Sequence, residues 1–421
     1  MLREKISSQY RKLFFIHEIE SSEVLQWFSG ATLLSFLITF NFWIYKEAIT
    51  VDSFIRNAYT CWPYFKNCGT WYFLRVLPDG YSQTTLYLGL LALIVAAVYF
   101  MWRQRWVIVH AITSLLLLWK ILVVFFLTYD LGGNFDYYHI LLTFVFLFFP
   151  FKLFFLKLSF VTFYFLSATV KYDEGWIAGT YFSALKTGIP LFLDNTIPLW
   201  TNLVIFMQTV GAWFLMSSRR ILQRGALLFF VIFHIYSGVL VYYHYPIMVL
   251  PSLLILFGPM YEHQRIPSGR KSLVGWVFVA FLFVFQAIPS IIPGNQKMTL
   301  EGNNYGFFMF EANHQCISRI SVRRTNGVEE LQEDTSAIAR NRCDPYRVWF
   351  RIQNQCTREE NSIDRIEWTF DHSINGGPFY RIVDERDACA LTYKVLQHNE
   401  WIKVPETGAQ VVGYPVENIY R

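Results

Sequence analysis

Residues 107–128 read VIVHAITSLLLLWKILVVFFLT and contain one charged side chain, that of Lys120. A helix of about 20 apolar residues is long enough to cross the roughly 30 Å hydrocarbon core of a bilayer. Comparable apolar windows lie at 30–48, 85–102, 198–216, 224–243 and 274–292, and shorter ones lie at 138–150, 153–170 and 246–260. The pattern predicts an all-α polytopic membrane bundle of about nine transmembrane helices.

The distribution of apolar residues separates a membrane region from a polar region. Of the 421 residues 54% are hydrophobic and 16% are charged, which is too apolar for one water-soluble globule. Residues 1–293 hold the apolar windows and are expected to form the transmembrane domain. Residues 294–421 alternate apolar with polar side chains, which predicts a β-rich extramembrane domain. The predicted strands are Ile317–Arg323, Tyr346–Ile352, Ile366–Phe370, Phe379–Val383 and Leu391–Val395.

Basic residues cluster in alternate predicted loops and so indicate the orientation. The first cluster, before the first span, contains Arg3, Lys5, Arg11 and Lys12. Because Lys and Arg are enriched in cytoplasmic loops, we expect a cytoplasmic N-terminus and an outer or lumenal C-terminal domain. The membrane is expected to be the bacterial inner membrane or, in a eukaryote, the endoplasmic reticulum. The net charge of +5 is loop charge of this kind, so no nucleic acid partner is expected.

The cysteines agree with this orientation. All six lie in the first long loop or in the tail, both predicted to be outside: Cys61, Cys68, Cys316, Cys343, Cys356 and Cys389. Disulfides form in oxidising compartments, so we expect them here. Six cysteines allow 15 pairings, and the sequence leaves the choice open. The Cys and His spacings are not those of a zinc site, so no metal is expected.

Several polar side chains fall at membrane depth, where an ionisable group is a functional candidate. They are Lys120, Asn134, Asp136, His139, Lys171 and His234. Each also has a structural interpretation. Lys120 could form an interhelical ion pair, Asn134 and Asp136 could cap a helix, His234 could bond a neighbouring helix, and Lys171 could reach the membrane surface. Their common depth predicts a cavity on the outer side whose aromatic wall suits a flat, lipid-soluble ligand such as a quinone.

Three segments resemble motifs of the vitamin K-dependent gamma-glutamyl carboxylases. The sequence FLSATVKYDEGW at 165–176 is similar to the segment with their catalytic lysine, and it places Lys171 on the lysine and Trp176 on the tryptophan. FHIYS at 233–237, with a downstream apolar run ending at 257–259, resembles their Phe-His motif. Tyr305-Gly306-Phe307 and Asn313-His314-Gln315 resemble the start of their lumenal β region. The matching order, from the first span to about residue 325, also resembles the wider horizontally transferred transmembrane domain group.

The resemblance implies a chemistry and a set of roles. In those carboxylases a neutral lysine deprotonates vitamin K hydroquinone, O2 converts it to the epoxide, and the strong base formed on the way drives attack of a peptide glutamate on CO2. By resemblance Lys171, His234 and His139 are expected to be catalytic. Asn134, Trp176, Lys120 and Tyr305 are expected to contact the quinone or substrate. The expected partners are membrane lipids, a reduced quinone and a secreted glutamate-containing peptide or protein.

The chain departs from the carboxylase pattern at two places. Phe135 stands where the family has a histidine tied to epoxidation, and His139, about one helical turn later, is expected to replace it. Tyr305-Gly306-Phe307-Phe308 replaces Trp-Asp-Met-Met, and the tail is shorter than in the animal enzymes. Epoxidation is therefore favoured over carboxylation. The alternative is a non-enzymatic membrane scaffold, or a lipid- or partner-binding protein, that retains this fold; a transporter is less favoured because the sequence shows no inverted repeat.

Overall fold

The computed structural model describes residues 2–45, 60–65, 68, 81–127, 133–183, 188–240, 244–337, 343–403 and 414–415. The chain forms two compact units. Unit 1 contains Met1–Phe165 and Met207–Phe281, and unit 2 contains Leu166–Phe206 and Leu282–Arg421. The predicted domain boundary at residues 293 and 294 stays a prediction.

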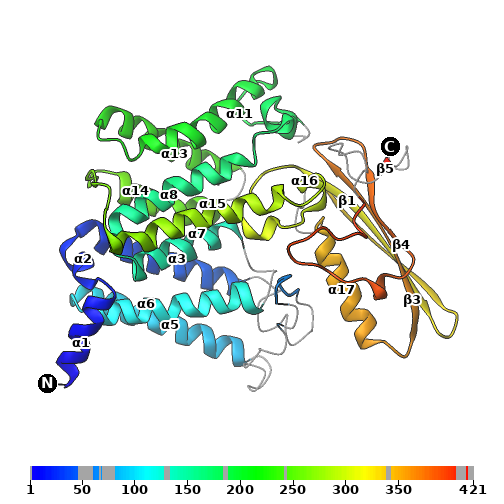
Figure 1. Ribbon diagram of the computed structural model, residues 1–421, viewed down its shortest axis with the longest axis horizontal. Helices are drawn as coiled ribbons and strands as arrows, with labels where there is room; N and C mark the ends of the chain where they lie inside the picture. Colours follow the sequence, from blue (N-terminus) through cyan, green and yellow to red (C-terminus); the bar gives the residue numbers. More distant parts are fainter. Residues whose placement is uncertain are drawn as a thin grey trace. The chain divides into compact units, whose positions relative to one another are not determined.

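Unit 1 is a helical bundle (Figure 1). Helices α3, α5, α6 and α7 pack against one another, α14 packs on α3 and α7, and α13 packs on α14. The helices are α1 (Leu2–Leu13), α2 (Ile16–Ser21), α3 (Glu23–Tyr45), α5 (Tyr81–Trp102), α6 (Trp106–Ile121) with its π-helical extension η3 (Leu122–Leu127), α7 (Asn134–Phe148), α8 (Lys152–Thr169), η5 (Met207–Gly211), α12 (Ala212–Phe214), α13 (Arg220–Leu240), α14 (His244–Phe257) and α15 (Leu273–Ala287), of which α8 and α15 continue into unit 2.

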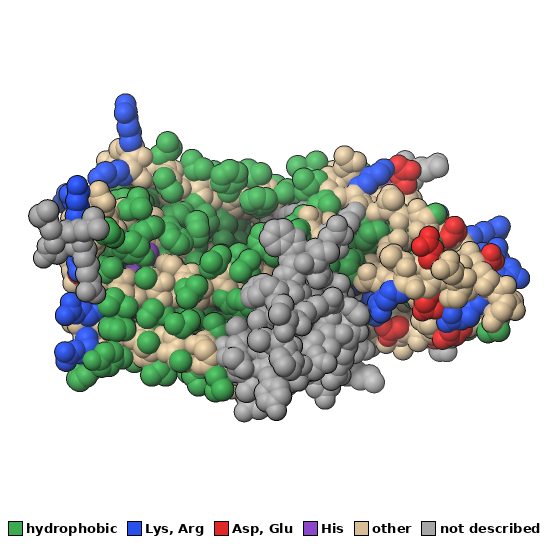
Figure 2. Space-filling view, turned by 90° about the horizontal axis from the view of Figure 1, so that it is seen from below, with side chains coloured by type: hydrophobic (Ala, Val, Ile, Leu, Met, Phe, Trp, Pro, Cys, Tyr) green, Lys and Arg blue, Asp and Glu red, His purple; other side chains and the backbone are tan. Residues whose placement is uncertain are grey.

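Within the described ranges six helical stretches are long and apolar enough to cross a membrane, which agrees with the predicted mostly helical, membrane-type bundle. They are Glu23–Trp43, Trp106–Phe126, Lys152–Thr169, Asp194–Phe214, Arg220–Val239 and Arg270–Ser290. Two shorter apolar helices, Leu88–Trp102 and Tyr245–Phe257, fall in other predicted windows. Hydrophobic side chains cover much of the helical face that Figure 2 shows, with Lys and Arg gathered at one end. The total of nine spans stays a prediction.

A tight turn joins α7 to α8 at the predicted hairpin. Phe151 adopts a left-handed conformation with φ of 53°. The Glu18 carboxylate accepts the backbone N–H groups of Phe151 and Lys152 at 2.9 and 2.7 Å. The Lys152 Nζ donates to the carbonyl oxygens of Phe146 and Leu147 at 2.7 and 2.9 Å. Side chains thus satisfy backbone groups that both helix ends leave without an intrahelical partner.

Unit 2 contains a small antiparallel sheet, as predicted, together with short helices. The described strands are β1 (His314–Arg324), β2 (Glu329–Ala337), β3 (Ile363–Ile374), β4 (Tyr380–Glu385) and β5 (Tyr414–Pro415), in the order β2-β1-β3-β4-β5 (Figure 1). The helices of unit 2 are α9 (Glu174–Ile177), α10 (Thr180–Ser183), η4 (Asp194–Thr196), α11 (Ile197–Phe206), η7 (Ile288–Ser290), α16 (Gln296–Thr299), η8 (Asn303–Tyr305), α17 (Pro345–Arg358) and η9 (Ala388–Ala390); a further short helix, η6 (Arg270–Ser272), precedes α15 in unit 1. Strands β1, β3 and β4 coincide with predicted strands, whereas β2 was not predicted.

The predicted strand Tyr346–Ile352 is wrong, because these residues form part of α17. Their apolar residues alternate, which is typical of a strand, but Trp349 interrupts the alternation and is also buried. Asp344 caps the helix by accepting the Tyr346 N–H at 3.0 Å, and Pro345 occupies the first turn. Both features favour the start of a helix.

The three disulfides confirm that the cysteines are paired. Cys61 pairs with Cys68 in unit 1. In unit 2 a bond between Cys316 and Cys343 joins β1 to the segment before α17, and one between Cys356 and Cys389 joins α17 to η9. The last two disulfides therefore fasten α17 to the sheet and to the segment that follows β4.

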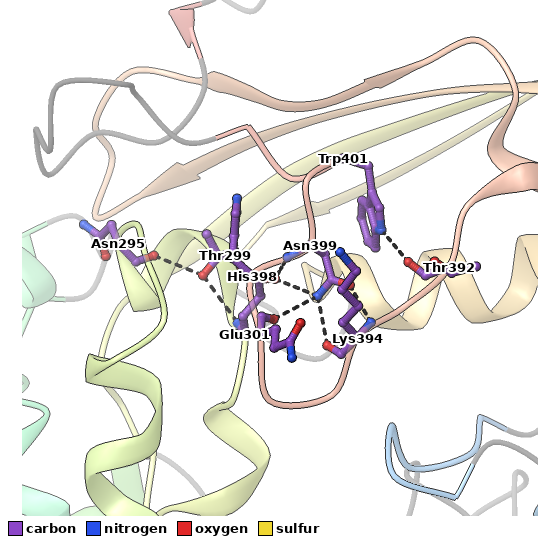
Figure 3. A network of polar contacts seen from close by, with 9 residues as sticks. Asn295, Thr299, Glu301, Thr392, Lys394, His398, Asn399 and Trp401 are labelled. Atoms are coloured by element: carbon purple, nitrogen blue, oxygen red, sulfur yellow. Dashed lines mark hydrogen bonds and ion pairs between the residues drawn. The ribbon is translucent and has the colours of Figure 1, made fainter.

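The predicted strand Leu391–Val395 is also wrong, because side chains rather than a strand ladder bind this segment (Figure 3). The buried Glu301 carboxylate accepts hydrogen bonds from His398 Nδ1 at 2.9 Å and from the backbone N–H and Nδ2 of Asn399 at 2.8 Å each. Asn399 Oδ1 in turn accepts the backbone N–H of Lys394 at 2.6 Å. A hydrogen-bonded loop therefore replaces the expected strand.

Candidate active site

Lys120 lies at the centre of a buried polar cluster in unit 1. Its Nζ lies 2.9 Å from Asp136 Oδ1, 2.9 Å from His139 Nδ1 and 3.0 Å from Thr39 Oγ1, so each of its three N–H bonds has a partner. Asp136 and His139 are three residues apart on α7 and therefore share one face of that helix. This geometry is the interhelical ion pair that was one interpretation of Lys120.

His139 is buried and contacts partners through both ring nitrogens. Its Nε2 lies 3.2 Å from the Thr32 carbonyl, which can only accept a hydrogen bond. The Nε2–H therefore donates to Thr32, and Nδ1 accepts from Lys120. A catalytic role for His139 in place of a histidine at Phe135 stays a prediction.

Asn134 is the first residue of α7 and lies two residues before Asp136. Asp136 Oδ2 accepts the backbone N–H of Gly133 at 3.0 Å, so Asp136 has the capping role proposed for this segment in addition to its ion pair. The Lys120 cluster thus holds the helix end that carries Asn134. Contact of Asn134 with a quinone stays a prediction.

His234 lies on α13 among buried tyrosines of unit 1. Its Nε2 is 2.5 Å from the Tyr164 hydroxyl. Its ring centroid is 5.5 Å from that of Tyr245, and the Tyr245 ring lies 5.4 Å from that of Tyr138. His234 therefore makes the interhelical hydrogen bond that was its structural interpretation.

Lys171 belongs to unit 2 and follows the end of α8. Its side chain is 2% exposed. Its Nζ donates to the Ser167 carbonyl at 2.5 Å and lies 5.4 Å from the centroid of the Trp176 ring. The amine therefore contacts a backbone acceptor and lies near an aromatic ring.

The ionisation of Lys171 follows from these surroundings. Burial lowers the pKa of the amine to about 7, because a buried ammonium loses its hydration. The negative charges of Glu311 and Asp173 act in the opposite direction, and the positive charge of Lys297 assists the lowering. A large fraction of Lys171 is therefore neutral near pH 7, as a lysine base requires.

Asp173 and Trp176 fix the segment around Lys171. Asp173 pairs with Lys297 and caps α9 by accepting the Gly175 N–H at 2.7 Å. Trp176 Nε1 donates to the Phe310 carbonyl at 2.6 Å. The resemblance singled out Lys171 and Trp176, and the structure brings these two together.

An aromatic wall extends from Trp176. Its ring stacks on that of Tyr181 with centroids 5.1 Å apart and planes at 28°, and both side chains belong to a buried cluster with Ile205. Burial, and next the charge of Glu311, raise the pKa of the Tyr181 hydroxyl, so that it stays neutral at physiological pH. Trp176 and Tyr181 therefore form a buried aromatic stack beside the Lys171 amine.

Gln286 links the two segments that carry the site, and the sequence interpretation missed it. On α15, its Nε2 lies 3.2 Å from both the Leu166 carbonyl and Thr169 Oγ1, and its Oε1 accepts the Phe307 N–H at 2.7 Å. It therefore ties the end of α8 before Lys171 to the chain before Glu311. The available signal was a single glutamine in the apolar window 274–292.

The remaining predicted residues have these positions. Tyr305 ends η8, and its side chain lies outside what the structure describes. Lys120, Asn134, His139 and His234 belong to unit 1, whereas Lys171 and Trp176 belong to unit 2. A cavity shared by the two sets stays a prediction. The described part of the chain contains no group of three or more His, Cys, Asp or Glu side chains that could hold a metal ion.

No family model, curated protein or solved structure matches this chain. The carboxylase resemblance consequently rests on the motifs quoted above.

Proposed function

We propose that this chain is an integral membrane enzyme in which Lys171 is the general base toward a reduced quinone. One observation carries the proposal: Lys171 is a buried amine that is not neutralised by an ion pair. Of the residues that the structure describes, none places a carboxylate within ion-pair distance of its Nζ, which instead donates to the Ser167 carbonyl. Lys120, by contrast, is equally buried but pairs with Asp136 at 2.9 Å. A buried, unpaired amine favours the neutral form that can accept a proton.

The surroundings of Lys171 suit this role. The Ser167 carbonyl orients the amine by accepting one of its hydrogens. The ring of Trp176 can stabilise the ammonium that forms when Lys171 takes a proton from a substrate hydroxyl. Trp176 and Tyr181 offer stacked aromatic surfaces to a planar ring. The neutral amine, the proton it receives and the aromatic wall together fit a hydroquinone better than an aliphatic substrate.

The overall reaction that we propose converts a reduced naphthoquinone such as vitamin K hydroquinone and O2 into the quinone epoxide and water. O2 is the oxidant, and Lys171 supplies and accepts only protons. Coupling to carboxylation of a peptide glutamate by CO2 is the further step that the family resemblance suggests. We also propose nine spans, with the disulfide-bonded region of unit 2 facing an oxidising compartment, since two of its disulfides join separate elements.

The proposal is tested by incubating the purified full-length chain with vitamin K hydroquinone and O2 and measuring the epoxide by chromatography. We expect the wild type to form epoxide and Lys171→Met to lower the rate about 100-fold or more, the usual range for loss of a general base. The control is Lys403→Met, which removes a half-exposed lysine paired with Glu385 in the same unit. It is expected to retain the wild-type rate.

Two results would overturn the proposal. One is equal epoxide formation by the wild type and Lys171→Met. The other is an absence of epoxide from folded wild-type protein, which would favour the alternative of a membrane scaffold that binds lipid or a protein partner.

A further inference from the structure

A polar pocket of about 330 Å³ lies within unit 2, and the proposed function does not use it. Its volume is within the range of roughly 300–1,000 Å³ that small-molecule sites occupy. The pocket is lined by residues from the end of β4, from η9 and from the loop after η9: Glu385, Ala390, Leu391, Thr392, Lys394, Asn399, Glu400 and Trp401. One compact unit therefore supplies all of these residues.

A buried carboxylate organises the loop that contributes most of the lining. Glu301, which is 2% exposed, accepts the backbone N–H and Nδ2 of Asn399 at 2.8 Å each (Figure 3). Asn399 also accepts the backbone N–H of Lys394 at 2.6 Å and donates from Nδ2 to the Lys394 carbonyl at 3.2 Å. The side chains of Lys394 and Glu400 therefore extend from a backbone that is already held in place. A preorganised loop loses little conformational freedom when a ligand binds.

Trp401 and Leu391 give the pocket an apolar surface of fixed geometry. Trp401 is 6% exposed, and its Nε1 donates to the Thr392 carbonyl at 3.0 Å. Its ring packs against that of Trp368, with centroids 5.4 Å apart. The Leu391 carbonyl accepts a hydrogen bond from Trp349 Nε1 of α17 at 3.2 Å. The pocket thus combines an ordered apolar patch with a few polar groups, as sites for small ligands do.

The charged groups at the pocket cancel one another. Lys394 Nζ lies 3.2 Å from a Glu400 carboxylate oxygen, and Lys403 Nζ lies 3.6 Å from one of Glu385. Two carboxylates and two ammonium groups leave no net charge, so the pocket favours neither an anion nor a cation. Both ion pairs are partly exposed, and exposed pairs contribute little to stability. A ligand can therefore bond to these groups without the loss of a strong contact.

We propose that this pocket binds a neutral pyranose sugar, either free or as the last residue of a glycan. A carboxylate only accepts hydrogen bonds and an ammonium only donates them, whereas a hydroxyl does both. Hydroxyls of one sugar ring can therefore bond to Glu385, Glu400 and Lys394, while its C–H groups contact Trp401 and Leu391. An apolar ligand would instead cover these charged groups without replacing their hydration, which is unfavourable. The proposal does not depend on the chemistry of Lys171.

Saturation-transfer NMR tests the proposal with the full-length chain in phosphatidylcholine nanodiscs, which contain no sugar. The probes are the methyl glycosides of glucose, galactose and mannose, with maltotriose in place of a glycan end. We expect saturation transfer to the ring C–H protons of at least one probe. Maltotriose that binds more tightly than methyl glucoside would identify a glycan end as the ligand, and equal binding would identify a single sugar. An absence of transfer to all four probes would overturn the proposal.

Variants of partly exposed lining residues locate the binding. Glu385→Ala and Lys394→Ala should each weaken binding about tenfold, the loss typical of a hydrogen bond to a charged group. Glu359→Ala is the control, since Glu359 is a partly exposed carboxylate of the same unit that pairs with Arg324, and it should bind as the wild type does. Thermal unfolding checks that each variant is folded. Wild-type affinity in both lining variants, or tighter binding of glucosamine or methyl glucuronide than of methyl glucoside, would contradict the proposed site.

Discussion

Lys120→Met is expected to lower the free energy of unfolding by about 3–5 kcal/mol, the range observed when one partner of a buried ion pair is removed. The physical reason is that Asp136, whose side chain is completely buried, would lose the cation that it contacts at 2.9 Å. His139 and Thr39 would also lose the amine that they contact. Because Asp136 caps the start of α7, the damage should spread to that helix end.

This effect is measured by thermal and denaturant unfolding of the full-length chain in detergent, followed by tryptophan fluorescence. Lys120→Met combined with Asp136→Asn should be less destabilised than Lys120→Met alone, because the double variant has no unpaired buried charge. Lys403→Met serves as the surface control. A loss below about 1 kcal/mol for Lys120→Met would contradict the ion-pair interpretation.

Lys171→Met is expected to change stability in the opposite direction. Methionine keeps the length of the side chain and removes a buried amine that no ion pair neutralises. A pKa that falls from 10.5 in the unfolded chain to about 7 in the folded one corresponds to about 5 kcal/mol of unfavourable ionisation free energy. Lys171→Met should therefore be at least as stable as the wild type while losing activity.

The difference in unfolding free energy between Lys171→Met and the wild type should depend on pH. Below pH 7 Lys171 is protonated in both states, so the folded wild type carries the full penalty of a buried ammonium. Between about pH 7 and 10.5 the unfolded chain binds more protons than the folded chain, and wild-type stability rises with pH. The stability advantage of Lys171→Met should therefore be greatest at pH 6 and should shrink by about 1.4 kcal/mol per pH unit above pH 7. Unfolding at pH 6, 7.5 and 9 measures it. An advantage that does not change with pH would show that Lys171 titrates normally.

The membrane bundle could be predicted from sequence because long apolar windows such as 107–128 have few alternative structures in water or lipid. The count of spans was harder, since α7 and α14 contain only 15 and 14 residues. In unit 2, alternation identified β1 and β3, but the same alternation in α17 led to a wrong strand. In α17 the helix cap by Asp344 and the burial of Trp349 outweighed the alternation of apolar and polar side chains that is typical of a strand.

The candidate site was predictable only where a single segment carries it. Lys171 and Trp176 lie five residues apart, so one motif contains both. Gln286 contacts the Leu166 carbonyl, 120 residues earlier in the chain, only through the tertiary fold. The pairing of the cysteines in unit 2 could not be predicted for the same reason, because the position of α17 against the sheet decides which cysteines meet. Tertiary contacts of this range leave no local pattern in a single sequence.

The central claim is that a neutral Lys171 is the base that acts on a reduced quinone. Its most direct test is the rate of epoxide formation from vitamin K hydroquinone by the full-length chain between pH 5 and pH 8. We predict that kcat/KM rises about tenfold per pH unit below a midpoint near pH 7, because only the neutral amine is active, and that Lys171→Met removes this dependence together with the activity. A rate that is independent of pH over this range, or a wild-type profile retained by Lys171→Met, would contradict the claim.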